Sequence, residues 1–420
     1  MNYILNQIRY ICKTYKDRSA GSPSEVSCQK HFARELRKWS DGVSTEEFTS
    51  HPKAFLGWII PVSLLNVISV LLFLMSIWTD RNALAYIGAG LMTLSICTFI
   101  LEFVLYYKFI DRLFPKKKSL NIFARRRPSG NINQRIVFGG HADASYEMTY
   151  FLKRNTKTSF LVFFGSIAGM LYTWIINIAA SIASLSGAAV ALSSTWVVLG
   201  IVALLFVPFF IASMFFINWR KIVDGANDNL TACLVSMSVI RKMHNDGIRL
   251  KNTEVCCLIT GAEESGLRGA MAFAKQHKEE FTDVETVFIA LETLHDVNHL
   301  QIYNKGINGT QKNSDRVADL LREAGRNCGI DLKDADIYPG ATDAEAFSRN
   351  GLLACGLGGV DHTPQTYYHT RYDTADNINE ECIERALSIC LEAAQLYDQE
   401  FTQEESNDAG NQHHKIASNL

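Results

Sequence analysis

The sequence has no strong excess of charge of either sign, since its net charge is −2 over 420 residues. This balance gives no reason to expect nucleic acid as a partner. Its ten cysteines show no regular spacing and include no Cys-x-x-Cys pair, which argues against a disulfide framework and a structural zinc knuckle. Reduced, mostly buried thiols are expected instead, as is typical of a domain that faces the cytosol. The first 18 residues lack a long apolar run, so no cleaved signal peptide is expected.

Two parts of the chain lack charged side chains altogether. Residues 54–78 and 83–101 are uncharged and are separated by the Asp80–Arg81 turn. Residues 158–219 contain no Asp, Glu, Lys, Arg or His, and small residues at 184–189 divide that block. Each half is long enough for the roughly 20 residues that a membrane helix needs. A buried globular helix of this length normally keeps a polar face. We therefore predict two transmembrane hairpins, with Pro208 kinking the last helix.

The remaining sequence alternates strand and helix patterns, which favours an α/β domain with a mainly parallel or mixed sheet covered on both faces. Strands are expected at Val43–Phe48, 136–140, Val255–Ile259, Thr286–Leu291, His299–Tyr303 and Leu352–Gly356. Helices are expected at Asn2–Tyr15, Ser24–Trp39, Asn229–Met243, Ser265–Lys278, Gln311–Ala324, Asp343–Arg349 and Asn377–Tyr397. The polar tail is expected to be disordered.

Glu263 and Glu264 are adjacent carboxylates at the turn between a predicted strand and a predicted helix. Like charges so close raise one pKa unless a cation lies between them. A metal ion supplies such a cation, because one glutamate can bind it while the other stays free to move a proton. Alone, the pair is more simply explained as a solvated acidic helix start, because glutamate is favourable near a helix N-terminus.

Further residues of metal-binding type lie at strand ends or in loops. His141 ends a strand with Asp143 two residues on, Asp228 lies in a glycine-containing loop, Glu292 ends a strand, and His369 lies in a loop. Open α/β sheets place their sites at such positions. Each residue alone has a structural explanation, such as a core histidine or an N-cap aspartate. Together with the glutamate pair they supply two imidazoles and several carboxylates, a set that suits a pair of zinc ions.

The order of these motifs resembles peptidase family M28, the zinc aminopeptidase-like group. That family shows His-x-Asp at a strand end, then Gly-Ala-x-Asp-Asn, Glu-Glu-x-Gly-Leu-x-Gly, an acidic strand end and Tyr-His-Thr-x-x-Asp-Thr. The sequence has these motifs in the same order at 141–143, 225–229, 263–269, 292 and 368–374. The turn at 18–22 and the stretch 340–343 also resemble family features. The resemblance implies a three-layer α/β/α zinc-exopeptidase-like domain with a mixed central sheet, interrupted by the transmembrane helices.

By this resemblance, Asp228 would bridge two zinc ions. His141 and Glu292 would complete the protein ligands of one ion, and Glu264 and His369 those of the other. Aminopeptidases of the family commonly have aspartate where Glu292 stands, which weakens the expectation of aminopeptidase specificity more than that of hydrolysis. Asp296 is a fallback ligand, although its expected role is that of a loop carboxylate.

The resemblance also implies roles in catalysis. Asp143 would hold the tautomer of His141. Glu263 would be the general base that activates water and the acid that protonates the leaving amine. Tyr368 would help to stabilise the tetrahedral oxyanion. The expected substrate is a peptide, and the expected activity is that of a zinc exopeptidase, most simply an aminopeptidase.

Two alternatives use the same fold. A glutaminyl-cyclase-like enzyme would use one zinc, and the presence of His141 argues for two. A non-catalytic scaffold of this family would usually have lost ligands, whereas this sequence keeps the full set. A transporter is disfavoured, because the apolar blocks lack the embedded charges that mark an ion path.

The transmembrane blocks constrain the topology. Because His141 and Asp228 must reach one metal, the block between them has to cross the lipid bilayer an even number of times. Basic residues flank the membrane on the domain side, which predicts a cytoplasmic catalytic domain. These residues are Lys108, Lys116, Lys117, Lys118, Lys153, Arg154, Lys157, Arg220 and Lys221. The predicted organisation is catalytic domain at 1–53, 108–157 and 220–400, hairpins at 54–107 and 158–219, and a disordered tail at 401–420. The sequence gives no indication of oligomeric state.

Overall fold

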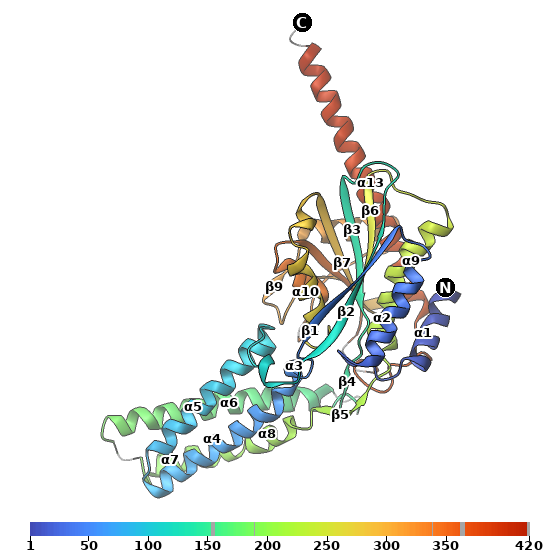
Figure 1. Ribbon diagram of the computed structural model, residues 1–420. Helices are drawn as coiled ribbons and strands as arrows, with labels where there is room; N and C mark the ends of the chain where they lie inside the picture. The colour runs from blue at the N-terminus through green and yellow to red at the C-terminus, as the bar shows by residue number, and fades with distance from the viewer. Residues whose placement is uncertain (153–155, 189, 338, 362–365, 418–420) are drawn as a thin grey trace.

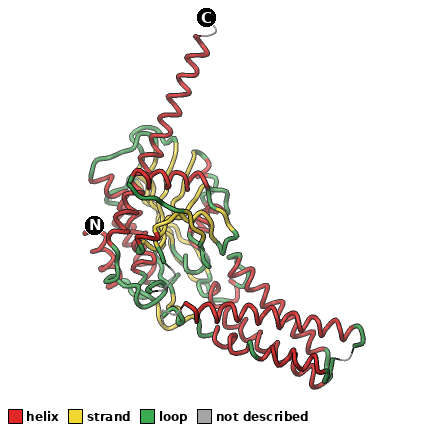
Figure 2. Tube along the Cα trace, turned by 180° about the vertical axis from the view of Figure 1, so that it is seen from behind, coloured by secondary structure: helices red, strands yellow, loops and turns green. Residues whose placement is uncertain are grey.

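The computed structural model describes residues 1–152, 156–188, 190–337, 339–361 and 366–417. Figure 1 shows an α/β domain with a bundle of long helices projecting from one end of it. The view from behind in Figure 2 shows the same separation, with the strands gathered in the domain and at its junction with the bundle. Lys153 and Arg154, which contribute to the predicted sidedness, lie outside the described residues.

The domain is built on one mixed sheet. Its strands lie in the order β1, β2, β6, β3, β7, β11, β8, β10, and β9 pairs with β8. β6, β3, β7 and β11 are parallel neighbours, whereas β2 runs antiparallel to both β1 and β6, and β8 runs antiparallel to β11. The strands are β1 (Gly42–Ser50), β2 (Lys117–Arg126), β3 (Gln134–His141), β6 (Thr253–Thr260), β7 (Glu285–Leu294), β8 (Leu300–Gly306), β9 (Gln311–Lys312), β10 (Asp334–Asp336) and β11 (Leu353–Gly359). The expected mixed central sheet is confirmed.

Helices cover both faces of this sheet. On β6, Val255, Cys257 and Ile259 share a core with one group of helices, and Cys256 and Leu258 share a second core with another group. The first group is α1 (Asn2–Thr14), α2 (Pro23–Leu36), α9 (Ala232–Asn245), α11 (Asp315–Asn327) and α13 (Glu380–Ala417). The second is α10 (Arg268–Gln276) and α12 (Asp343–Ser348). This alternation of strand side chains gives the three predicted layers.

The bundle contains four helical stretches that are long and apolar enough to cross a membrane, at Ala54–Thr79, Ala83–Val104, Lys157–Leu185 and Ser194–Ser213. Their elements are α3 (Ala54–Gly57), α4 (Ile59–Thr79), α5 (Ala83–Thr98), the π-helix η1 (Phe99–Val104), α6 (Thr156–Leu185), α7 (Ser194–Leu204) and α8 (Val207–Ser213). The break between α7 and α8 lies just before Pro208, where the sequence predicts a kink. Large apolar side chains such as Leu64, Ile87 and Ile175 are exposed on the outer faces, as expected of a lipid-facing surface.

The two helical hairpins leave and rejoin the domain at the same end of the bundle (Figure 1). The strands β4 (Tyr146–Met148) and β5 (Ile217–Ile222) pair with each other, so the chain enters and leaves the second hairpin side by side. At the far end, the amide of Leu192 donates to the carbonyl of Ile77, joining the two hairpins. All ten cysteines are free, as expected of reduced thiols.

Several boundaries differ from the sequence prediction. The sequence analysis missed β2, because the basic residues at both ends of this strand mask its alternating Leu120, Ile122 and Ala124. Helix α10 begins at Arg268 rather than Ser265, because Gly266 and Leu267 have positive φ angles of 86° and 60°. The polar tail was expected to be disordered from residue 401, but α13 continues to Ala417. The tail contains no proline and follows directly on a packed helix, so the helix continues into it past Gly410.

The remaining short elements are the 3-10 helices η2 (Asp111–Leu113), η4 (Glu280–Thr282) and η5 (Val297–His299), and the π-helix η3 (Ala226–Thr231). Inside η3, Asp228 and Asn229 have non-helical backbone angles, and the peptide between them is cis. Because of these backbone angles, the regular helix α9 begins at Ala232, whereas the sequence predicts a start at Asn229.

Candidate metal centre

The predicted metal-binding residues gather at one edge of the sheet. His141 is the last residue of β3 and pairs with Thr260 at the end of β6. Glu263 and Glu264 follow β6 by a few residues, and Glu292 lies near the end of β7, the neighbour of β3 on its other side. Parallel strands that end together bring these side chains to one place, as the positions of the motifs predict.

Asp228 lies between the two histidines. Its Oδ1 is 3.2 Å from Nε2 of His141, and its Oδ2 is 2.9 Å from Nε2 of His369. Asp228 and His141 are each 2% exposed, and His369 is 7% exposed. One carboxylate therefore presents a separate oxygen to each of two imidazoles in a buried space, an arrangement able to bridge two cations.

Two overlapping groups of potential ligand atoms share Asp228. One contains His141, Asp228 and Glu292, and the other contains Asp228, Glu264 and His369. Within each group the ligand atoms all lie within 4.8 Å of one another. Oδ2 of Asp228 and Oε1 of Glu264 are buried, and Nε2 of His369 lies 2.9 and 3.1 Å from them. Carboxylate oxygens and imidazole nitrogens in such triplets are the donor types that zinc prefers.

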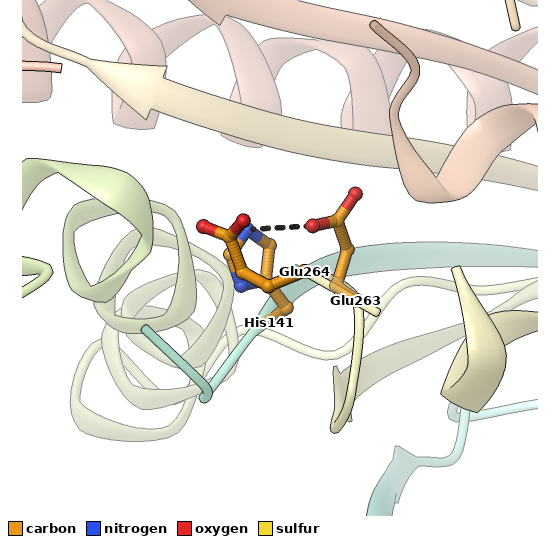
Figure 3. A group of neighbouring side chains, drawn as sticks. All are labelled: His141, Glu263 and Glu264. Atoms are coloured by element: carbon orange, nitrogen blue, oxygen red, sulfur yellow. Dashed lines mark ion pairs between the residues drawn. The ribbon is translucent and has the colours of Figure 1, made fainter. Parts of the chain in front are cut away.

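A third group of neighbouring side chains contains His141, Glu263 and Glu264. Figure 3 shows these three side chains converging from β3 and from the turn after β6. Nε2 of His141 is 3.6 Å from Oε2 of Glu263, which the figure marks as an ion pair. Glu263 thus contacts the metal-binding edge while taking no part in the two groups that share Asp228.

The cluster carries an excess of buried negative charge. Burial raises the pKa of Glu263 well above its ordinary range, and the nearby carboxylates of Glu292 and Glu264 raise it further. Burial raises the pKa of Glu292 to about 7 despite the opposing effect of His141. Burial alone would lower the pKa of His369, but the carboxylates of Glu264 and Asp228 raise it to about 10. A divalent cation would relieve this repulsion, so the donor set fits a metal.

The Glu263–Glu264 turn is held by two acidic side chains. The carboxylate of Asp143 accepts hydrogen bonds from the amides of Glu263 and Glu264, both at 3.1 Å. The buried carboxylate of Glu25, on α2, accepts from the amide of Ala262 at 2.9 Å. These bonds fix the direction in which the glutamate pair leaves β6.

The predicted role of Asp143 therefore needs a refinement. Nδ1 of His141 is 3.2 Å from the backbone carbonyl of Asp143 and 3.5 Å from its carboxylate. The carbonyl is thus the hydrogen-bonding partner that fixes the ring, whereas the carboxylate serves chiefly the backbone of the glutamate turn. Sequence analysis missed Glu25, because Ser22 and Glu25 have the spacing of an ordinary helix cap.

The loop that carries Asp228 is fixed from two sides. The buried guanidinium of Arg18 donates to the carbonyls of Ala142, Asp224 and Gly225, which ties the end of β3 to this loop. Gly225 has φ +59°, and a Cβ there would lie 2.7 Å from the carbonyl of Asp228. Glycine is therefore required at this position of the motif.

Asp373 holds the same loop from the other side. Its carboxylate accepts from the amides of Asn227 and Asp228 at 2.7 and 3.2 Å. Burial, together with the charge of Asp228, raises the pKa of Asp373 to about 7. The sequence places Asp373 in a motif but assigns it no role. Its contacts with Asn227 and Asp228, which lie about 145 residues away in the chain, can be identified only from the folded structure.

Asp296, the fallback ligand, lies apart from both groups of potential ligands. Its carboxylate accepts from the hydroxyl of Tyr367 at 2.9 Å and from the amide of Asp361 at 2.6 Å. Glu292 instead reaches the cluster, where Oε1 accepts from the hydroxyl of Thr293 and Oε2 from the side-chain amide of Asn229. The structure thus brings Glu292, and not Asp296, to the cluster.

Tyr368 lies beside the cluster and stacks on His369, with ring centroids 4.0 Å apart. Burial raises the pKa of its phenol well above the ordinary range, and the neighbouring carboxylates raise it further. The phenol therefore remains a hydrogen-bond donor at neutral pH.

Residues 213–394 match the family model described as Peptidase family M28. This part of the chain is similar to peptidase family M28. The matched range contains Asp228, Glu263, Glu264, Glu292 and His369, whereas the His141 motif precedes it, on the other side of the second helical hairpin.

A curated protein sequence is also similar to this chain. The chain is 26% identical over 163 residues to the putative endoplasmic reticulum metallopeptidase 1-B of Caenorhabditis elegans. That match covers 39% of this chain and only 18% of the longer relative. Together with the partial match to the family model, it supports a metallopeptidase-type function.

Solved structures share the fold at low identity. The zinc aminopeptidase BSAP from Bacillus subtilis is 12% identical with a TM-score of 0.53, and 93% of each chain is covered. The aminopeptidase from Aneurinibacillus sp. strain AM-1 is 14% identical with a TM-score of 0.53, over 93% of this chain and 92% of that one. The glutaminyl cyclase from Fimbriiglobus ruber is 13% identical with a TM-score of 0.54, over 94% of each chain. The fold is thus common to both activities.

Proposed function

We propose that the protein is a membrane-anchored zinc aminopeptidase that hydrolyses peptide bonds at a two-metal centre. The observation that carries this proposal is the position of Asp228, whose two oxygens lie within 3.2 Å of His141 and 2.9 Å of His369. Asp228 would bridge two zinc ions, which His141 and Glu292 on one side and Glu264 and His369 on the other would hold. When bound, the ions would polarise the scissile carbonyl and make water nucleophilic at neutral pH.

Glu263 is the proposed general base. Its raised pKa, caused by burial and neighbouring carboxylates, suits a group that must accept and return a proton near neutral pH. It lies beside His141 without belonging to the two ligand groups that share Asp228. In the proposed reaction the water oxygen bonds to the acyl carbon, the C–N bond breaks, and Glu263 delivers the water proton to the leaving amine.

Tyr368 is proposed to stabilise the negative charge that develops on the carbonyl oxygen. Its phenol stays protonated because burial and nearby carboxylates raise its pKa. Stacking on His369 restrains the direction of the ring. A fixed donor placed where charge develops lowers the barrier without reorganisation.

Membrane anchoring rests on the four long apolar helices and their exposed apolar outer faces. The basic residues Lys116, Lys117, Lys118, Arg220 and Lys221 lie at the domain end of the bundle, whereas the Asp80–Arg81 pair is the only charge among the described residues of the far end. By the positive-inside rule we propose that the catalytic domain faces the cytoplasm.

A glutaminyl-cyclase-like activity is the second candidate, because solved glutaminyl cyclases share the fold. It would need one metal, whereas the group of His141, Asp228 and Glu292 supplies a second complete set of ligands. The same complete set argues against a scaffold without activity.

The test compares two substrates on the detergent-purified full chain. One is a leucyl-aminomethylcoumarin reporter, and the other is a peptide with N-terminal glutamine whose cyclisation releases ammonia. We expect hydrolysis of the reporter, its loss on N-acetylation of the leucine, and its loss in Glu263→Gln but not in Glu323→Gln, an exposed carboxylate on α11. Cyclisation without reporter hydrolysis would favour the second candidate. If neither substrate reacted, both candidate functions would be contradicted.

A further inference from the structure

A cavity of about 350 Å³ runs from the metal centre into the helical bundle. At one end it is lined by Glu263, Glu264 and His369. At the other it passes between α4, η1, α6 and α8, where Val62 and Met170 are among the lining residues. This volume lies within the ~300–1,000 Å³ of typical ligand sites. The cavity thus connects the proposed catalytic site with the interior of the helical bundle.

Among the residues that the structure describes, the cavity lining is charged only at the end near the metal centre. Apart from Glu263, Glu264 and His369, these described lining residues are uncharged, and most are aromatic or aliphatic. A ligand that fills it therefore needs a polar group at the metal centre and an apolar portion among the bundle helices.

The apolar portion also contains a few polar side chains. Trp58, Asn66 and Ser159 are among its lining residues, and they are 8%, 3% and 5% exposed. A peptide with apolar side chains meets both requirements, because its N-terminal end is polar and its side chains suit the mainly apolar lining.

We propose that this cavity binds apolar peptides, with the residues that follow the scissile bond lying among the bundle helices. An aminopeptidase holds one residue on the acyl side of that bond, so a long cavity belongs to the leaving side. Trp58 and Asn66 are eight positions apart on the helical backbone, which corresponds to about 12 Å at ~1.5 Å per residue. An extended peptide advances ~3.3 Å per residue, so this length accepts three to four residues. The inference rests on the proposed function and narrows its substrate to peptides of hydrophobic, membrane-derived character.

The first test compares three substrates that share an N-terminal leucine. They are Leu-Leu-Val-Phe-amide, Leu-Glu-Lys-Ser-amide and N-dodecyl leucinamide, which has a long chain but no further amide. We expect kcat/KM to be highest for the apolar peptide, by at least about tenfold over the charged peptide, because several apolar side chains leave water. Equal values for the two peptides would overturn the proposal. A dodecylamide as good as the apolar peptide would also overturn it, in favour of an alkyl-chain substrate.

The second test fills or alters the cavity. Val62→Trp should lower the ratio of kcat/KM for the apolar peptide to kcat/KM for leucyl-aminomethylcoumarin about tenfold, because the added ring occupies space that only the longer substrate uses. Leu64→Trp is the matched control on the outer face of α4, where Leu64 is 48% exposed, and should leave this ratio unchanged. Equal ratios in Val62→Trp and wild type would contradict the proposal.

Photo-crosslinking separates this inference from the proposed function. The apolar peptide would carry a diazirine on its third residue, and the Glu263→Gln chain would be used so that bound peptide stays intact. Adducts mapped by mass spectrometry to the cavity-facing residues of α4 and α6 are expected, and competition by the unlabelled peptide should remove them. If such adducts form but no substrate is hydrolysed by the wild type, the peptide site stands and the proposed hydrolysis fails. If hydrolysis occurs but adducts fall outside the bundle, the proposed function stands and this inference fails.

Discussion

Nη2 of Arg268 lies 2.9 Å from Oε1 of Glu102, and this ion pair joins the α/β domain to the bundle. Arg268 is the first residue of α10, just after the Glu263–Glu264 turn, and Glu102 lies in η1 at the end of the second apolar helix. Both residues are essentially buried, and Asp111 adds a second carboxylate 3.0 Å from the guanidinium. The turn that carries the proposed base and one metal ligand is therefore packed directly onto the membrane part.

The first prediction concerns this ion pair. Arg268→Ala should destabilise the protein by about 3–5 kcal/mol, because it leaves Glu102 and Asp111 buried without their cation. The measurement is the thermal unfolding midpoint in detergent. Lys275→Ala on the exposed face of the same helix is the control and should change the midpoint little. An equal and small effect of both substitutions would show that the pair contributes no net stability.

The second prediction separates the base from the ligands. Glu263→Gln should lower kcat by roughly 10²–10⁴-fold, because the group that moves the proton is lost, while zinc content stays at the wild-type value. Glu264→Gln should instead lower zinc content, since it removes a proposed ligand. Colorimetric zinc assay and reporter hydrolysis on the same preparations measure both. Wild-type turnover in Glu263→Gln would remove this residue from the mechanism.

The third prediction concerns the support of the glutamate turn. Asp143→Ala removes the acceptor for the amides of both Glu263 and Glu264. Because loss of such supporting contacts typically costs 10–100-fold, we expect a decrease of that order in zinc affinity or kcat. Titration with a zinc chelator gives the affinity. If affinity and kcat were both unchanged, the turn would be held sufficiently by Glu25 alone.

The fourth prediction is a pH dependence of stability from Glu345. This buried carboxylate accepts from the amide of Thr342 and from Asn313, and burial raises its pKa from 4.5 to about 7. The folded chain therefore binds this proton more tightly than the unfolded chain. The associated stability is complete below about pH 4.5 and is lost as pH rises through 7, by on the order of 3 kcal/mol.

Glu345→Gln should remove this dependence, so its unfolding midpoint should fall less than that of wild type between pH 5 and pH 8. Glu323→Gln, on the exposed face of α11, should follow the wild-type curve. Parallel curves for Glu345→Gln and wild type would mean that the Glu345 carboxyl is ionised throughout this range.

The fifth prediction concerns sidedness. Two exposed positions are suited to introduced cysteines. Arg81 lies in the far turn of the bundle, and Lys116 lies on the domain side. With a cytoplasmic domain, a membrane-impermeant maleimide should label Arg81→Cys in intact cells and Lys116→Cys only after permeabilisation. The wild-type chain gives the background from its own cysteines. The opposite pattern would place the domain outside.

Much of the architecture follows from local patterns in the sequence. Uncharged runs identify the apolar helices, and the strand before each motif places His141, Glu263 and Glu292 near one edge. The missed strand β2 shows the limit of this approach. Its central residues pair with β1 on one side and β6 on the other. The short alternation of apolar residues between two basic ends identifies a strand only once these neighbours are known.

The supporting contacts of the site could not be predicted for the same reason. Glu25 contacts the amide of Ala262 and Arg18 contacts the carbonyl of Asp224, across more than 200 residues of sequence. No local spacing encodes such contacts. The cavity beneath the metal centre likewise depends on how α4 and α6 pack, which their nearly uniform apolar composition leaves undetermined.

The central claim is that Asp228 bridges two metal ions, and metal content tests it most directly. Zinc bound to the detergent-purified chain would be measured by inductively coupled plasma mass spectrometry for wild type, His141→Ala and His369→Ala. The control is His299→Ala, a partly exposed histidine outside the two ligand groups. The account predicts two zinc ions per chain in wild type and in the control, and a loss in each of the two ligand variants. One zinc that persists in His141→Ala, or no zinc at all in wild type, would contradict it.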